Sequence, residues 1–94
     1  MREYEMVLIF NPDLEEEALS SSLEKLTGWI DSNGGSVISQ EQWGRKRLAY
    51  PIRSFRQGIY VLARYNGESK LNQELEANLK FAEEVLRYLV VKKE

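Results

Sequence analysis

The sequence predicts an α+β fold in which two helices cover one face of a four-stranded antiparallel sheet. Four segments are rich in β-branched and aromatic residues, and two others carry leucines at the three- and four-residue spacings of a helix. These segments follow one another in the order β-α-β-β-α-β, which is the ferredoxin-like split βαβ arrangement. Its right-handed crossovers place both helices on the same face. We expect a single domain of this kind over residues 1–94.

The first half of the chain is expected to form one strand and one helix. The strand covers residues 2–10, and Pro12 ends it. Asp13 is expected to cap the following helix, with Glu16 as its partner in a capping box. The apolar face of this helix comprises Leu19, Leu23, Leu26 and Ile30. The glycines of residues 33–35 end it, since glycine adopts the left-handed conformation at little cost.

The second half is expected to form a hairpin, a second helix and a last strand. The three strands cover residues 36–52, 58–66 and 85–92. The second strand is long and bent near Gly44, and residues 53–57 form a polar turn. The second helix starts near Ser69, and its apolar face comprises Leu71, Leu75, Leu79 and Ala82.

Alternation along the strands predicts which side chains lie beneath the helices and which face water. The helix-covered set comprises Tyr4, Met6, Leu8, Phe10, Ile59, Val61, Ala63, Tyr65, Leu86, Tyr88 and Val90. The apolar set left on the open face comprises Val7, Ile9, Tyr60, Leu62, Leu89 and Val91. Adjacent apolar side chains on an open face exceed the scattered exposure of an ordinary surface. They predict that a protein partner covers this face.

The composition disfavours an enzyme. The chain has neither cysteine nor histidine, so the commonest nucleophile, zinc ligand and proton shuttle are missing. The carboxylates have no partner suited to catalysis and no metal-ligand spacing is present, so we expect no activity, no metal and no cofactor. No apolar run approaches the roughly 20 residues that span a bilayer, and no secretory signal is evident. A cytoplasmic protein without membrane contact is expected.

Basic residues concentrate in one part of a chain whose formal net charge is -2. Residues 1–42 carry two basic and nine acidic side chains, and residues 65–94 carry five basic and six acidic. Residues 43–64 carry six basic side chains and none acidic. The overall charge therefore conceals a local excess of positive charge, which is typical of contact with a polyanion.

The centre of this basic segment is the run Arg45, Lys46 and Arg47. Arginine and lysine suit phosphate oxygens, and Trp43 and Tyr50 beside them suit stacking on unpaired bases. Charged residues also protect exposed strand edges from pairing with other chains. From the residues alone, an RNA contact and a solvated hairpin are equally good interpretations of this run.

Two other uses of the same fold agree poorly with the sequence. RNA-recognition motifs stack bases on aromatic residues across the open sheet, but Leu62, Val7 and Ile9 occupy the corresponding positions here, so stacking across the sheet is disfavoured. Acylphosphatases have a glycine-rich anion cradle with an arginine after the first strand. Here that loop is Asn11-Pro12-Asp13, where a phosphate would meet negative charge, so this hydrolase activity is rejected.

Several motifs together resemble the bacterial small-subunit ribosomal protein six family over nearly all 94 residues. They are the start MREYE, the Asn11-Pro12 break, WGRKRLAYPI at 43–52, QGIY at 57–60 and LVVK at 89–92. The resemblance implies a non-enzymatic structural constituent of the small ribosomal subunit, located on the cytoplasmic ribosome. It also implies binding to ribosomal RNA of the central domain (the platform), as a heterodimer with small-subunit ribosomal protein eighteen.

The resemblance further implies which residues lie at each surface, with no small-molecule substrate. Those expected near RNA, at one end of the sheet, are Arg2, Arg45, Lys46, Arg47, Lys92 and Lys93. Those expected at the protein partner are Val7, Ile9, Tyr60, Leu62, Arg64, Leu89 and Val91. Many family members continue into a flexible tail, and no contact of that tail is carried over. The alternative is a homo-oligomeric regulatory or ligand-binding domain that uses the open face for a second copy or a small ligand.

Overall fold

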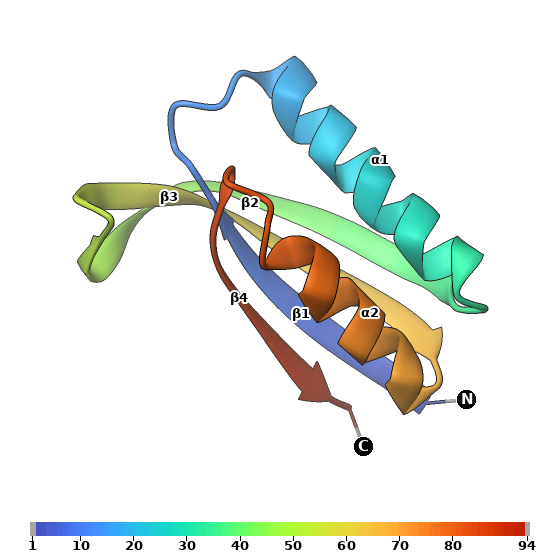
Figure 1. Cartoon of the computed structure of the whole chain (residues 1–94). Helices are drawn as coiled ribbons and strands as arrows, with labels where there is room; N and C mark the ends of the chain where they lie inside the picture. The colour runs from blue at the N-terminus through green and yellow to red at the C-terminus, as the bar shows by residue number, and fades with distance from the viewer. Residues whose placement is uncertain (1, 94) are drawn as a thin grey trace.

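The computed structural model describes residues 2–93 and confirms the predicted order of strands and helices. The elements are β1 (Arg2–Phe10), α1 (Glu16–Ser32), β2 (Ser36–Ile52), β3 (Phe55–Gly67), α2 (Ser69–Leu79) and β4 (Val85–Lys92). The strands lie in the order β2-β3-β1-β4, and every neighbouring pair is antiparallel. Both helices lie over one face of the sheet and leave the other face open (Figure 1).

The main core fills the space between the helices and the sheet, as the alternation predicts. The strand residues in it are Tyr4, Met6, Leu8, Phe10, Ile59, Val61, Ala63, Tyr65 and Val85, and the helix residues are Leu19, Leu23, Leu26, Ile30, Leu71, Leu75 and Leu79. Tyr65 is the largest fully buried side chain, and its hydroxyl donates a hydrogen bond to Asn72 Oδ1 at 2.6 Å. Burial raises the pKa of Tyr65 well above its ordinary value.

The first helix begins later than predicted, and the capping box is wrong. α1 begins at Glu16 with Glu15 at its N-cap, and no side chain caps it. The Asp13 backbone N–H instead donates to Asn11 Oδ1 at 2.8 Å, which is an Asx turn. Leu14 packs against the main core before the helix starts. Residues 11–15 therefore connect the end of β1 to the helix layer before the helix begins.

The turn between β2 and β3 is also shorter than predicted. It consists of Arg53 and Ser54 alone, with φ values of 49° and 71°. Two successive residues with positive φ are the mark of a tight two-residue hairpin whose twist matches that of the strands. The predicted turn of residues 53–57 is wrong because Phe55 already belongs to β3 and packs in an apolar cluster. The part of the hairpin from 43 to 60 is called the arm below. Its inner end still lies beneath the helices, since Ile59 belongs to the main core, and its outer end around the turn extends beyond them (Figure 1).

One predicted core residue lies on the other face of the sheet. Phe10 pairs with Val85 while Ile9 pairs with Arg87, so Leu86 is an extra residue at a β-bulge. Leu86 joins Ile9 on the open face instead of the core beneath the helices. The rest of β4 follows the predicted alternation, because Tyr88 and Val90 pack against the main core.

Candidate functional site

The basic residues predicted to lie near RNA fall at two ends of the sheet. Arg2 begins β1, Lys92 pairs with Tyr4 two residues further along, and Lys93 follows Lys92 in the chain. Arg45 of β2 and Phe10 of β1 both pair with Ile59 of β3, so Arg45 lies level with Phe10. Phe10 is eight residues beyond Arg2 along β1. At about 3.3 Å per strand residue, the two groups are separated by roughly 26 Å. The expectation of one basic end is therefore wrong, and the terminal group and the arm group are separate surfaces.

The three consecutive basic residues Arg45, Lys46 and Arg47 of the arm alternate between the two faces. Arg45 lies on the helix-covered side, and its Nε donates to the carbonyl oxygen of Pro12 at 2.9 Å. Lys46 lies on the open side, where its Nζ is 5.6 Å from the centroid of the Trp43 ring. Arg47 follows and is exposed. None of the three has an ion pair with another residue of the described chain, 2–93.

The arm curls over one end of the open face and is held there by an apolar cluster and two polar contacts. The cluster comprises Ile9, Leu48, Leu86, Ile52, Phe55 and Tyr60. Arg87 Nη1 donates to the Tyr50 hydroxyl at 2.6 Å. Arg53 Nη1 donates to the carbonyl oxygen of Glu83 at 3.3 Å. These contacts join the arm to β4 and to the segment just before it, across the end of the sheet.

This second cluster is not predicted from the sequence. Its signal is Leu48, Ile52 and Phe55, three large apolar residues around the turn predicted to be polar. Gly58 is the other signal. A Cβ on Gly58 would overlap with Cγ2 of Ile9, so only glycine lets the arm approach the sheet this closely.

Strand pairing arranges the open face as rows of side chains that cross the sheet. The row nearest the arm is Gly44, Tyr60, Ile9 and Arg87, the next is Glu41, Leu62, Val7 and Leu89, and the third is Ser39, Arg64, Glu5 and Val91. The middle row holds three adjacent apolar side chains. The first row, at the arm, adds the aromatic Tyr60 and the basic Arg87. The third row, toward the chain ends, adds the charged Arg64 and Glu5.

The six apolar residues predicted to face water are exposed to very different degrees. Leu62 and Ile9 are only 5% and 9% exposed, so the prediction is wrong for them. Ile9 is covered by the arm, and Leu62 lies on a central strand with neighbours on both sides. Leu89 and Val91 are 57% and 49% exposed because β4 is an edge strand. The other two are half-buried, so among these six residues the two exposed ones both lie on β4.

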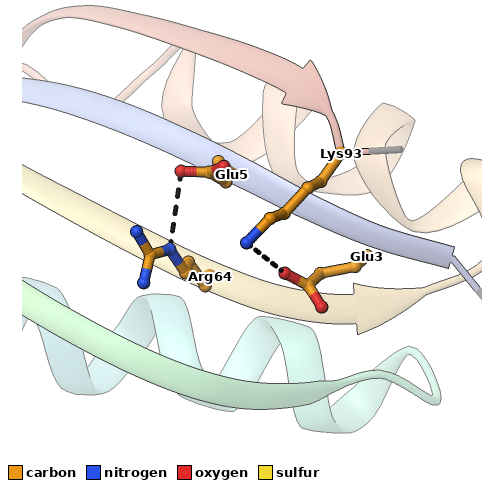
Figure 2. A network of polar contacts seen from close by, with 4 residues as sticks. All are labelled: Glu3, Glu5, Arg64 and Lys93. Carbon is orange, nitrogen blue, oxygen red and sulfur yellow. Dashed lines mark hydrogen bonds and ion pairs between the residues drawn. The ribbon is translucent and has the colours of Figure 1, made fainter.

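Near the chain ends, the basic residues of the open face are paired with carboxylates. Arg64 Nε lies 3.5 Å from Glu5 Oε2, and Lys93 Nζ lies 3.2 Å from Glu3 Oε2 (Figure 2). All four side chains remain partly exposed, so each pair contributes at most about 1 kcal/mol to stability. Arg64, predicted to contact a partner, and Lys93, predicted to lie near RNA, are thus both neutralised locally in the free protein.

Two other kinds of site are absent from the described residues. Within 2–93, no group of three or more Asp or Glu side chains could hold a metal ion. In the same part of the chain, no helix is long and apolar enough to cross a membrane. The arm, the open face and the cluster of charges near the chain ends are the candidate interaction surfaces.

Comparison with known proteins identifies the family. The family model of ribosomal protein S6 matches residues 3–92. The chain belongs to the ribosomal protein S6 family. Two curated S6 relatives are named small ribosomal subunit protein bS6. The one from Moorella thermoacetica is 46% identical over 94 residues, which cover 100% of this chain and 96% of the relative. The one from Symbiobacterium thermophilum is 44% identical over 92 residues, which cover 98% of this chain and 97% of the relative.

A solved S6 structure has the same fold. The crystal structure of 30S ribosomal protein S6 from Thermotoga maritima superposes with a TM-score of 0.92 at 26% identity. The match covers 98% of this chain and 87% of that one. The ferredoxin-like fold and the S6 family predicted from the sequence are both confirmed.

Proposed function

We propose that this protein is a structural constituent of the small ribosomal subunit, in the cytoplasm, with no enzymatic activity. In this role it binds ribosomal RNA of the central domain together with small-subunit ribosomal protein eighteen. Membership of the S6 family supports the ribosomal role. The RNA contact and the named partner come from the resemblance of the sequence and from the surfaces described above.

The observation that carries RNA binding is the way the arginines of the arm end are held. Arg45 and Arg53 donate to backbone carbonyl oxygens, and Arg87 donates to a tyrosine hydroxyl. These acceptors are neutral, so they fix each side chain without cancelling its charge. Phosphates can then bind at positions that are ordered in advance and still positive, and counterion release supplies much of the affinity.

The partner would cover the exposed apolar surface of β4. Leu89 and Val91 are about half-exposed on an edge strand, and Val7 continues the apolar row inward. A complementary apolar surface would bury all three. Arg64 would lie at the rim of this contact with its charge already balanced by Glu5. The other residues assigned to the partner, Ile9, Tyr60 and Leu62, would support the surface from beneath.

RNA binding over a series of salt concentrations tests the proposal. The probe is a small-subunit central-domain RNA, with and without purified protein eighteen. We expect binding only with the partner present, and binding that weakens as salt is raised. Replacing Arg45, Lys46 and Arg47 by alanine should reduce the slope of log K against log salt by about 0.7–0.9 for each phosphate that the variant no longer neutralises.

A matched control places the same kind of substitution on the helices. Lys25 of α1 and Lys70 of α2 are exposed on the helix side of the sheet, and their replacement by alanine should leave the slope unchanged. An equal reduction of the slope by both sets of substitutions would show that RNA binding depends only on the net charge of the protein. Absence of RNA binding with the partner present would contradict the ribosomal proposal. A stable homodimer in sedimentation, without RNA, would favour the homo-oligomeric alternative.

A further inference from the structure

Trp43 is a large aromatic residue that the fold does not use. It is 46% exposed and lies in neither of the two buried clusters. Gln42 pairs with Val61 and Gly44 with Tyr60, so Trp43 is an unpaired residue at a bulge in β2. Gly44 has a φ of 80°, which glycine adopts readily. Such bulges redirect a side chain, and this one leaves the indole outside the core.

The surroundings of the indole are positively charged. Lys46 Nζ lies 5.6 Å from the ring centroid and has no ion pair with any residue in 2–93. No acidic residue occurs anywhere from 43 to 64. An exposed aromatic ring beside an unbalanced cation suits a ligand that is both flat and anionic. A basic protein segment would be repelled here.

We infer that Trp43 and Lys46 form a site for one unpaired nucleotide of RNA, in which the base stacks on the indole and the ammonium contacts the phosphate. The inference rests on the proposed RNA binding and specifies how the arm would hold RNA. Bases within a duplex present only their edges, so the site requires a nucleotide from a loop, bulge or junction. Because stacking accepts any base, the site recognises an unpaired nucleotide and not a sequence.

The position of the site differs from that of base stacking across an open sheet. The central row of the open face offers Val7, Leu62 and Leu89, which cannot stack on a base. The bulge moves the stacking group to the edge strand, beside the apolar row. A protein partner can therefore occupy the row while a nucleotide occupies the indole.

Fluorescence of Trp43 tests the inference directly. The chain has two tryptophans, so Trp29→Phe leaves Trp43 as the only indole. The probe is the central-domain RNA with purified protein eighteen. Binding of RNA should quench the Trp43 emission and protect it from acrylamide. In the otherwise unchanged protein, Trp43→Ala should weaken RNA binding by about tenfold, and Trp43→Phe should recover most of that loss.

The salt dependence separates the two groups of the site. Trp43→Ala should leave the slope of log K against log salt unchanged, because stacking involves no phosphate. Lys46→Gln should reduce the slope by about 0.7–0.9, the value expected for a single phosphate. The matched control is Phe81→Ala, which removes another exposed aromatic ring, 81% exposed, that follows α2. This control should leave RNA affinity unchanged.

Three outcomes would overturn the inference. RNA binding with unchanged Trp43 emission and unchanged affinity of Trp43→Ala would show that the indole lies outside the RNA contact. Quenching by the partner protein alone would assign Trp43 to the protein interface. An equal loss from Trp43→Ala and Phe81→Ala would show a non-specific effect. Absence of RNA binding by the unsubstituted protein and its partner would instead overturn the proposed function, so the two failures are distinguishable.

Discussion

The two ends of the sheet hold their basic residues in different ways. At the arm end, Arg45, Arg53 and Arg87 donate to neutral oxygens. At the end near the chain termini, Arg64 and Lys93 lie beside the carboxylates of Glu5 and Glu3. Hydrogen bonds to neutral acceptors fix a cation and keep its charge, whereas ion pairs cancel it. A count of basic residues therefore does not predict where an anion binds.

The two ends also differ in how well their apolar side chains are buried. The arm end has a buried cluster of its own around Ile9, Leu48 and Leu86. Toward the chain termini, Leu89 and Val91 remain half-exposed. The arm end is therefore packed against other parts of the protein itself. The apolar surface of β4 is exposed in the free protein, and it is the surface that we propose a partner covers.

The largest expected effect comes from breaking the cluster beneath the arm. Leu48 is 8% exposed, and Leu48→Ala should lower the free energy of unfolding by about 2–4 kcal/mol, since it removes buried methyl groups and leaves a cavity. Leu89→Ala is the matched control. Leu89 is 57% exposed, so its loss should change stability by less than about 0.5 kcal/mol. Urea unfolding measures the change in stability of both variants. Equal changes would show that burial in the arm cluster adds no stability.

A smaller effect is expected from overfilling the same cluster. Gly58→Ala places a Cβ where it overlaps with Cγ2 of Ile9, and the forced shift should cost about 1–3 kcal/mol. Gly28→Ala is the control, because nothing lies within 4 Å of its Cβ position. In the interior of α1 that substitution should stabilise the protein by roughly 0.5–1 kcal/mol.

The cause of the Gly58→Ala effect can be tested with a second substitution. If contact with Ile9 makes Gly58→Ala destabilising, then Ile9→Ala should make the glycine substitution less costly. The cost of Gly58→Ala in the Ile9→Ala background, measured by a double-mutant cycle, should fall well below its cost alone. Simple additivity of the two changes would place the strain elsewhere.

The sequence predicted the fold because hydrophobic periodicity reports local burial. The leucines of α1 and α2 and the alternation of Tyr4, Met6, Leu8 and Phe10 all lie where their spacing places them. The errors fall where a local irregularity interrupts a regular element. Leu86 changes face because of a bulge, and the first helix begins late because Asn11 forms an Asx turn. Neither irregularity leaves a mark in the spacing of apolar residues, so the sequence pattern does not reveal it.

The candidate surfaces were predicted less well because they depend on distant parts of the chain. Arg2 and Arg45 were placed at one end of the sheet, but strand pairing sets them at opposite ends. Ile9 and Leu62 were expected on an exposed surface, and the arm and a central position bury them. Composition gives the charge of a segment, whereas the neutrality of an acceptor such as the Pro12 carbonyl is visible only in three dimensions.

The smallest expected effect lies at the opposite end of the face. Glu5→Gln removes the ion pair with Arg64 and keeps a side chain of similar size. The two side chains are 28% and 36% exposed, so solvent screens their attraction, and the loss should be about 0.5 kcal/mol or less. This loss should disappear in about 1 M salt, where charges are screened within about 3 Å.

The same substitution tests whether local charge cancellation is the reason that the two ends differ. With Glu5 neutral, Arg64 keeps its full charge, like the arginines of the arm end. If local cancellation is what keeps the ends distinct, Glu5→Gln should steepen the salt dependence of RNA binding in the complex with the partner. An unchanged slope would mean that position in the assembly, and not local charge balance, excludes RNA from this end of the face.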